Sequence, residues 1–192
     1  MAGVSAAAAP DDHAGRMSTR PPDTALSLYD TSLADLDLAG RPPRVVLDTG
    51  VVVSALVFGG AAATRLRRAW RHGFCRPLVC RRTLMDLTHQ LSAAQLGFSL
   101  AERQQMLSEY LPYVLKVRLS EAPSPGDLEP AGLAFVQLGL AGQAHALVTS
   151  DASLLAMGAR LPFPVMALEP FLDLLRQSAI APVPLRQSPR RR

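Results

Sequence analysis

Short apolar runs alternate with longer amphipathic stretches along the chain from Arg44 onward. Four of the runs are rich in Val, Leu and other apolar residues and have the length of strands that are buried on both faces. A fifth stretch, residues 115–121 (LKVRLSE), alternates between apolar and polar positions and suits an edge strand. The four buried strands are predicted over residues 44–48, 75–80, 145–151 and 163–168.

The stretches between the strands have the apolar period of amphipathic helices. In residues 62–73, Leu66, Ala69 and Trp70 share one face, and a glycine ends the pattern. In residues 99–115, Ser99 is followed three positions later by a glutamate, which predicts a helix start with a capping box. Further helices are predicted over residues 81–93, 131–144, 152–157 and 169–178, and a helix or turn over residues 54–58.

This alternation predicts an α/β fold with a mainly parallel sheet and helices on both faces. Residues 44–176 carry the pattern and form the predicted domain. Residues 1–43 are rich in Ala, Pro, Asp and Ser, so we expect a disordered or loosely docked extension. Within it, residues 24–38 (TALSLYDTSLADLDL) have the pattern of a short amphipathic helix that docks elsewhere on the protein. Residues 177–192 form a basic tail that we expect to be disordered.

Composition and charge narrow the class of protein. Of the 192 residues, 48% are hydrophobic and 5% aromatic, enough for one domain with a core made mainly of Leu, Val and Ala. The formal net charge of +4 is unevenly placed, because residues 1–43 carry three Arg and six acids while residues 177–192 carry four Arg and no acid. A mildly basic domain is compatible with a polyanionic partner. No apolar run reaches about 18 residues, so we expect no membrane-spanning helix.

The two cysteines, Cys75 and Cys80, provide no disulfide framework. His72 and His89 lie nearby in the sequence, but a tetrahedral zinc site would need a second cysteine pair that the chain lacks. We therefore expect reduced cysteines in a cytoplasmic protein.

Two acids, Asp48 and Asp151, each stand at the C-terminal end of a predicted apolar strand. Ligands of parallel sheets bind at this edge, so both acids are expected on the same rim. Gathered carboxylates repel one another unless a cation lies between them, and Mg²⁺ and Mn²⁺ prefer such oxygen ligands. The arrangement is typical of metal-assisted hydrolysis, often of phosphodiesters.

Asp86 is a third candidate for this site. It lies one position off the apolar stripe of the helix predicted over residues 81–93, so its side chain could reach the sheet rim. Each acid also has a plainer interpretation: Asp48 and Asp151 as caps of the helices that follow them, and Asp86 as the ion-pair partner of Arg82. The three acids taken together favour a site.

Three segments of the sequence resemble a PIN domain. They are VVLDTGVVVSALVFGG (residues 45–60), LMDLTHQL (84–91) and LAGQAHALVTSDASLLAM (140–157), and the resemblance covers about residues 44–175. It is strongest to the bacterial branch that contains toxin components of toxin–antitoxin systems. The resemblance implies a three-layer α/β/α sandwich with a mainly parallel central sheet, and a Mg²⁺- or Mn²⁺-dependent ribonuclease. It also implies an RNA substrate, a small antitoxin protein as partner and a possible homodimer.

Position by position, the resemblance assigns the catalytic and metal-binding acids of the family to Asp48, Asp86 and Asp151. It also implies that four neighbouring polar residues support these carboxylates through hydrogen bonds. The four residues are Thr49, Ser54, Thr149 and Ser150.

The sequence departs from the family pattern at three positions. Gly50 stands where the family usually has Asn, Asp86 is one methylene shorter than the usual Glu, and Leu133 stands where a helix acid would fall. The nearest acids to Leu133 are Asp127 and Glu129, of which Glu129 is a candidate replacement ligand for the metal. A two-metal site needs ligands for ions ~3.5–4 Å apart, whereas three acids can hold one ion with several waters.

Residues 65–82 are rich in arginine and contain no acid. Arg65 and Arg68 lie one helical turn apart, and together with Arg82 they are candidate contacts for RNA phosphates, since arginine binds phosphate through two hydrogen bonds. The alternative is a solvated helix face.

The sequence thus favours a metal-dependent endoribonuclease, the toxin of a toxin–antitoxin pair. The alternative is a catalytically impaired PIN-like module that binds RNA or a partner protein without cleaving. The segment VVLDTG also resembles the D-x-D loop of haloacid-dehalogenase-type phosphotransferases. Such an enzyme would need a second Asp at the position of Gly50 and a suitably placed lysine, whereas Lys116 is the only lysine in the chain.

Overall fold

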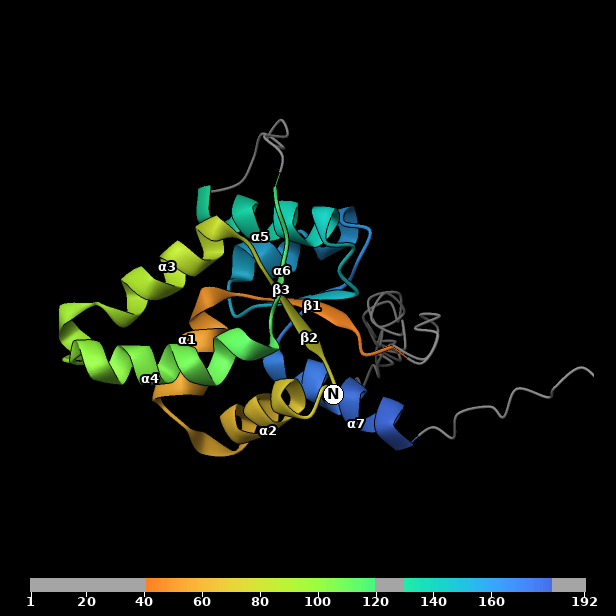
Figure 1. The fold of residues 1–192 in the computed structure, drawn as a ribbon. Coiled ribbons are helices and arrows are strands. Elements are labelled where there is room, and N and C mark those ends of the chain that lie inside the picture. Colours follow the sequence, from red (N-terminus) through yellow and green to blue (C-terminus); the bar gives the residue numbers. More distant parts are fainter. Residues whose placement is uncertain (1–40, 120–129, 181–192) are drawn as a thin grey trace, which may run out of the picture.

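The central layer of the molecule is a five-stranded, all-parallel sheet with the order β3-β2-β1-β4-β5 (Figure 1). The computed structural model describes residues 41–119 and 130–180. In the middle of the sheet, Val46 of β1 is in register with Leu78 of β2 and Leu147 of β4. The strands are β1 Arg44–Leu47, β2 Arg76–Val79, β3 Leu115–Lys116, β4 Ala146–Val148 and β5 Val165–Met166.

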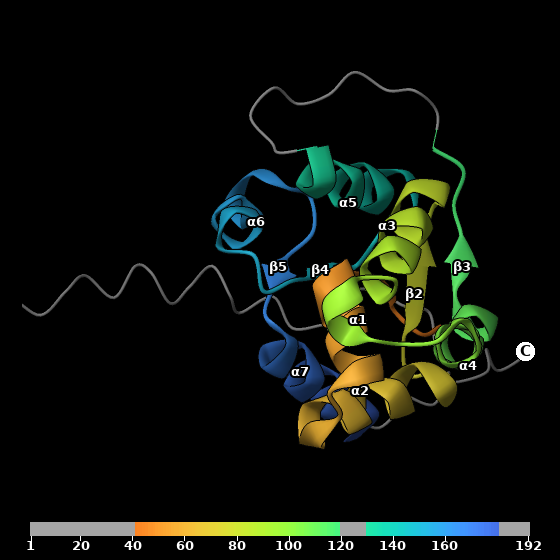
Figure 2. The same cartoon turned by 90° about the vertical axis from the view of Figure 1, so that its left-hand side faces the viewer.

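Helices cover both faces of the sheet (Figures 1 and 2). On one face, Val45 and Leu47 of β1 pack in a core that includes residues of α1, α2, α3 and α7. On the other face, Val46 packs with residues of α5 and α6. The helices are α1 Thr49–Val57, α2 Gly60–Arg71, α3 Arg81–Leu91, α4 Leu100–Tyr110, α5 Pro130–Ala141, α6 Ala152–Ala156 and α7 Leu168–Ile180. The predicted three-layer α/β/α sandwich is therefore confirmed.

Several predicted elements differ in extent, most clearly the first helix and the edge strand. The first helix, α1, begins at Thr49, directly after β1, and not at residue 54; its apolar residues lie on all sides, so the sequence has no amphipathic period there. The edge strand β3 covers only Leu115–Lys116 of the predicted residues 115–121. The capping box at the start of α4 is confirmed, with the Ser99 hydroxyl accepting from the N–H of Glu102 and the Glu102 carboxylate accepting from the N–H of Ser99.

The C-terminal end of helix α5 and the residue that follows it pack closely because both contacts involve glycines. A Cβ on Gly142 would lie 2.5 Å from Cδ1 of Leu78, and a Cβ on Gly139 would lie 2.4 Å from the ring of Phe163. This close packing fixes the wall that α5 contributes at the edge of the sheet.

The last helix, α7, continues to Ile180, four residues beyond the domain boundary predicted at 176. Of the predicted extension (residues 1–43) and tail (177–192), residues 1–40 and 181–192 lie outside the described residues. In the described part of the chain, no single helix is long and apolar enough to cross a membrane, and the one bent pair that meets this criterion, α1 with α2, does so by length and composition alone.

Candidate functional site

Asp48 lies at the carboxyl end of β1, where it caps α1. Its Oδ1 accepts a hydrogen bond from the N–H of Gly50 at 3.0 Å, and its Oδ2 accepts one from Oγ1 of Thr149 at 2.6 Å. The residue is half-buried. Two donors therefore hold the carboxylate in one orientation.

Asp151 lies three residues after β4 and caps α6. Its Oδ1 accepts hydrogen bonds from the N–H groups of Ser153 at 2.7 Å and Leu154 at 3.4 Å, and the residue is exposed. The capping role that the sequence suggested for both aspartates is thus confirmed. Each cap also leaves carboxylate lone pairs free for another ligand.

Thr149 joins the two aspartates. Its fully buried hydroxyl donates to Asp48 and accepts the N–H of Asp151 at 3.0 Å. The Thr149 N–H in turn donates to the carbonyl of Met166 in β5. One side chain therefore sets the position of the β1 and β4 ends relative to each other.

The three predicted acids converge on one pocket of about 220 Å³ at the carboxyl edge of the sheet. Asp86 reaches it from α3, is half-buried, and forms no ion pair with Arg82, although both belong to the described residues. The other lining residues are Thr49, His89, Gln90, Gly132, Phe135 and Leu154.

Sequence reasoning assigned no role in this site to His89 or Gln90. Both lie one turn beyond Asp86 on α3, at the spacing that places helix side chains on the same face. Once Asp86 was a candidate, this helical spacing could have identified His89 and Gln90 as further residues of the site.

The donor set of the pocket suits a hard divalent cation. The side chains that would hold such an ion are the carboxylates of Asp48, Asp86 and Asp151, and the pocket has room for water molecules as well. Within the described residues, no three His, Cys, Asp or Glu side chains form a ready-made set of direct ligands. Carboxylate oxygens are ligands of the kind that Mg²⁺ takes, and Mg²⁺ usually keeps several of its waters.

The position of the missing helix acid is apolar in the structure. Gly132 lines the pocket from α5, while Leu133 is only 8% exposed and belongs to the buried core. The candidate replacement ligand, Glu129, lies outside the described residues, as does Asp127. At Gly50, an added Cβ would meet only Oδ1 of Asp48, at 3.9 Å, so the site has space for a larger side chain.

The four predicted supporting residues are placed differently. Thr49 is buried and lines the pocket, and Thr149 holds Asp48 directly. Ser54 is exposed on α1 and Ser150 is exposed in the loop after β4, and neither lines the pocket.

Neither cysteine is in an environment that favours a reactive thiolate. Cys75 and Cys80 are both free and buried. Burial raises the pKa of the Cys75 thiol to about 12, so it stays protonated at neutral pH.

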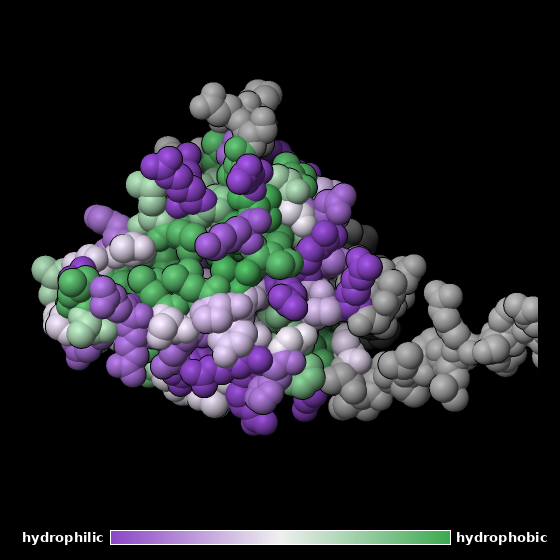
Figure 3. Space-filling view, viewed as in Figure 1, coloured by the Kyte–Doolittle hydropathy of each residue, from purple (hydrophilic) through white to green (hydrophobic). Residues whose placement is uncertain are grey.

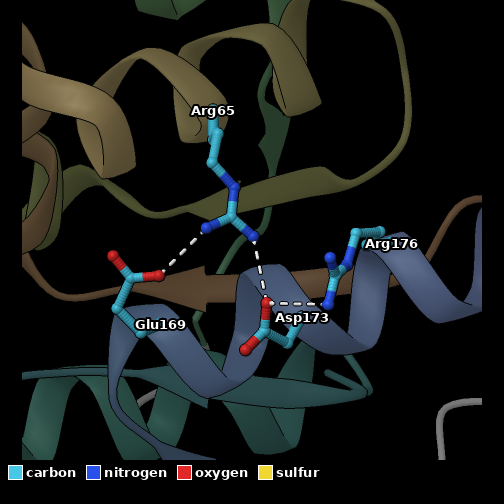
Figure 4. Close-up of polar contacts among 4 residues, drawn as sticks. All are labelled: Arg65, Glu169, Asp173 and Arg176. Atoms are coloured by element: carbon cyan, nitrogen blue, oxygen red, sulfur yellow. Dashed lines mark hydrogen bonds and ion pairs between the residues drawn. The ribbon is translucent and has the colours of Figure 1, made fainter.

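The three arginines proposed to contact RNA lie in different parts of the structure. Arg65 bridges α2 and α7, with ion pairs to Glu169 at 3.0 Å and Asp173 at 3.2 Å (Figure 4). Arg68 is exposed in the last turn of α2, which leads into the amino end of β2 and so lies toward the opposite edge of the sheet. Arg82 is exposed on α3 and lines a groove that shares Asp86 with the acidic pocket.

Comparisons with known proteins agree with the fold. A family model described as PIN domain matches residues 44–153, more than half of the chain. No curated protein matches the chain.

Three solved structures match the chain at low sequence identity. VapBC2 from Rickettsia felis, bound to a DNA fragment from its promoter, is 14% identical over 65% of this chain and 98% of that chain, with a TM-score of 0.46. A PilT N-terminus domain protein from Sulfolobus solfataricus is 13% identical over 73% and 97%, with a TM-score of 0.46. A protein from Pyrobaculum aerophilum is 17% identical over 70% and 90%, with a TM-score of 0.47.

Proposed function

The chain belongs to the PIN domain family, and we propose that it is a metal-dependent endoribonuclease that hydrolyses RNA phosphodiesters. The observation that carries this proposal is the convergence of Asp48, Asp86 and Asp151, from three separate segments, on one small pocket. Three carboxylates facing a phosphodiester would repel it, so a cation is needed for the site to bind RNA at all.

The residues of the pocket have distinct tasks in this reaction. When bound at the three carboxylates, Mg²⁺ or Mn²⁺ would activate the attacking water and neutralise the charge that develops on the phosphate. Thr149 and the N–H of Gly50 hold the Asp48 carboxylate in one orientation. The first turn of α6 holds Asp151 in the same way. The chain thus supplies a pre-oriented set of oxygen donors, which reduces the reorganisation needed when substrate arrives.

We propose that cationic side chains beside the pocket bind the phosphates of the RNA. Arg82 is exposed and lines the adjoining groove, so it suits the phosphate-binding role proposed for it. Arg65 already contacts two carboxylates, and Arg68 lies toward the other edge of the sheet. We therefore give the RNA-binding role to Arg82 in preference to the other two.

We also propose that the protein is the toxin of a toxin–antitoxin pair in the cytoplasm, silenced by a small antitoxin protein and able to form a homodimer. This part of the proposal rests on the resemblance of residues 45–60, 84–91 and 140–157 to that branch of the family.

A second candidate is a PIN-like module that binds RNA or a partner protein without cleaving. The observation that favours it is the apolar wall of the pocket on α5, where Gly132 and Phe135 line the pocket and the buried Leu133 stands at the position of the family acid. The absence of an asparagine side chain at Gly50 adds to this argument.

An RNA cleavage assay separates the two candidates. Purified protein is incubated with single-stranded and structured RNA in Mn²⁺, in Mg²⁺ and in EDTA, beside an Asp48→Asn variant. Asparagine also caps helices, so this variant keeps the fold while removing a charge. We expect metal-dependent cleavage that falls at least ~100-fold in the variant, an effect of the size expected for a catalytic metal ligand.

Ser54→Ala is the matched control, because Ser54 lies on the same helix but does not line the pocket, and it should retain full activity. Equal activity of wild type and Asp48→Asn would indicate a contaminating nuclease. If the wild type binds RNA but does not cleave it with either ion, the non-cleaving module is the correct candidate.

A further inference from the structure

A groove of about 1490 Å³ adjoins the acidic pocket, between α3 and the segment that follows β3. Figure 2 looks at this side of the molecule, where α3 and β3 stand on either side of β2. Figure 3 shows apolar surface between α3 and β3, bordered by hydrophilic side chains. Pockets for small molecules measure about 300–1,000 Å³, so this groove has room for a polymer segment.

The border of the groove is cationic, and its charged side chains are exposed and could bind a ligand. Arg81, Arg82, Lys116 and Arg118 line it and are all exposed. None of the four takes part in an ion pair within the described part of the chain. The groove therefore suits a ligand that carries several negative charges.

The floor of the groove is aliphatic. Leu84, Met85, Val117 and Leu119 line it, and no Phe, Tyr or Trp occurs among the described lining residues. Stacking of nucleic-acid bases depends on aromatic side chains, whereas an aliphatic floor suits the leucines of an amphipathic helix. The combined surface favours an acidic, leucine-rich polypeptide over RNA as the occupant of the floor.

The N-terminal part of this chain contains such a segment. In residues 24–38, Leu26, Tyr29, Leu33 and Leu36 recur at helical spacing and would form one apolar stripe. Asp30 and Asp37 flank the stripe, Asp35 lies on the opposite face of the helix, and no Lys or Arg occurs between residues 21 and 40. We propose that residues 24–38 dock in the groove as an amphipathic helix, with the stripe on the aliphatic floor and the flanking Asp30 and Asp37 toward the cations of the border.

The connection to the domain is long enough for this docking. The carbonyl of Pro43 accepts a hydrogen bond from the N–H of Arg76, so the chain enters the domain beside β2. Val79, at the far end of β2, lines the groove, and three residues of strand correspond to ~10 Å. Residues 41–44 belong to the described part of the chain, so the free connection is the three residues from Leu38 to Arg41, which span up to ~10 Å, and a helix over residues 24–38 would add ~22 Å of reach.

Docking would obstruct the proposed active site. Asp86 and His89 line both the groove and the acidic pocket, so an occupant at that end lies at the mouth of the pocket. The aspartates of the segment would also occupy the cations assigned to RNA phosphates. The segment therefore acts as a built-in competitor of RNA, a consequence that rests on the proposed function, whereas the docking itself does not.

Disulfide trapping in the full-length chain tests the docking. One variant combines Ala34→Cys, which leaves the apolar stripe intact, with Met85→Cys at a 60% exposed position in the groove. The native cysteines are buried, so they should not compete. We expect an intramolecular disulfide to form under mild oxidation, visible as a mobility shift of the monomer on a non-reducing gel and confirmed by peptide mass.

The matched control combines Ala34→Cys with His72→Cys. His72 is exposed and lies four residues from Arg76, close to the point where the connection enters the domain. A segment that samples space at random would react at least as fast with this position as with position 85. We expect the Met85 pair to react at least ~10-fold faster, the effective-concentration advantage of a docked segment. Equal rates, or disulfides that join two chains only, would overturn the proposal, the latter in favour of a second copy as occupant.

Neutralising the aspartates tests the charge argument. The variant Asp30→Asn, Asp35→Asn, Asp37→Asn should lower the rate of the Ala34–Met85 disulfide at low salt, and should bind fluorescent single-stranded RNA ~5- to 10-fold more tightly, since a competing polyanion is removed. Unchanged trapping would contradict docking through these charges. Faster trapping with unchanged RNA affinity would overturn the proposal in favour of a separate protein partner for the cations. None of these measurements requires cleavage, so a failure of the proposed nuclease activity would be seen separately.

Discussion

The α2–α7 side of the molecule and the carboxyl edge of the sheet both carry several charged residues. The two regions differ in whether these charges form ion pairs. On the α2–α7 side, Arg65 pairs with Glu169 and Asp173, while Arg71 pairs with Glu109 at 3.0 Å. At the carboxyl edge, acids gather in one pocket and the cations of the adjoining groove form no ion pairs among the described residues.

This difference separates charges that hold the fold together from charges that are free to bind. A paired arginine on the surface adds a modest amount to stability, about 0.2–1 kcal/mol for each pair, and its guanidinium is less available to a ligand. Unpaired cations beside an acidic pocket contribute little to the fold and much to the local field. We therefore expect substitutions on the two sides to affect different measurements.

Among substitutions outside the three carboxylates, the largest effect is expected at the carboxyl edge, from Thr149→Val. This nearly isosteric change removes the hydroxyl that donates to Asp48 and accepts from the N–H of Asp151. Cleavage should fall about 10- to 100-fold, the range seen when residues that orient metal ligands are changed. Leaving two polar groups without this partner should also lower the free energy of unfolding by about 1–3 kcal/mol. Initial cleavage rates and urea denaturation measure the two effects, and Thr149→Ser should restore most of both.

Reversing charge in the groove should have the next largest effect. The double variant Arg82→Glu, Arg118→Glu is expected to weaken binding of single-stranded RNA about 10-fold or more at low salt. The slope of log affinity against log salt should become shallower by ~0.7 for each phosphate that the protein no longer neutralises. Fluorescence anisotropy over a salt series measures both. An unchanged slope would show that the groove cations do not bind phosphates.

Arg65→Ala tests the opposite side. Loss of two ion pairs with partly exposed partners should lower the free energy of unfolding by at most ~1 kcal/mol, and less at high salt, because the charges are screened. RNA affinity should stay within about twofold of wild type, because binding depends on cations that face phosphates. A loss of RNA affinity comparable to that of the groove variant would remove the distinction between the two sides.

The smallest effect is expected from His145, at the amino edge of the sheet. Its Nδ1 accepts the N–H of Arg44 at 2.9 Å, and burial, with a contribution from the Arg44 charge, lowers the pKa of His145 below its ordinary value of 6.5. The unfolded chain takes up a proton near pH 6.5 while the folded chain resists it, so stability should fall as the pH drops below this value. Chemical denaturation between about pH 5 and 8 measures this slope, and His145→Gln should flatten it without changing RNA affinity. A slope that the variant keeps would place its origin elsewhere.

The sequence predicted most of the fold and part of the site, for reasons that particular residues make clear. Buried parallel strands and amphipathic helices have strong local patterns, and Asp48 and Asp151 were found because they follow such strands. The start of α1 was placed wrongly since a helix buried on nearly all sides has no polar face to reveal its period. The bridging geometry of Thr149 depends on contacts about a hundred residues apart, which no local pattern contains.

The arginines show most clearly that sequence patterns do not reveal contacts between distant parts of the chain. Arg65 and Arg82 look equivalent in the sequence, and the acids that pair with Arg65 come from α7, more than a hundred residues later. Whether a charge is satisfied is a property of the tertiary structure. The convergence of Asp86 with the strand-end acids likewise required the packing of α3 against α1.

The central claim is that the three carboxylates at the edge of the sheet hold a divalent cation. The most direct test is Mn²⁺ binding to the full-length protein, followed by electron paramagnetic resonance of the free ion, for wild type, Asp48→Asn and Asp173→Asn. Asp173 is an acid of the α2–α7 side, about half exposed and paired with Arg65, and serves as the control for loss of one negative charge. We predict a saturable site in wild type and in Asp173→Asn that is lost or weakened at least ~10-fold in Asp48→Asn, as expected when one oxygen ligand is removed. Equal binding in all three proteins, or no saturable site in wild type, would contradict the account.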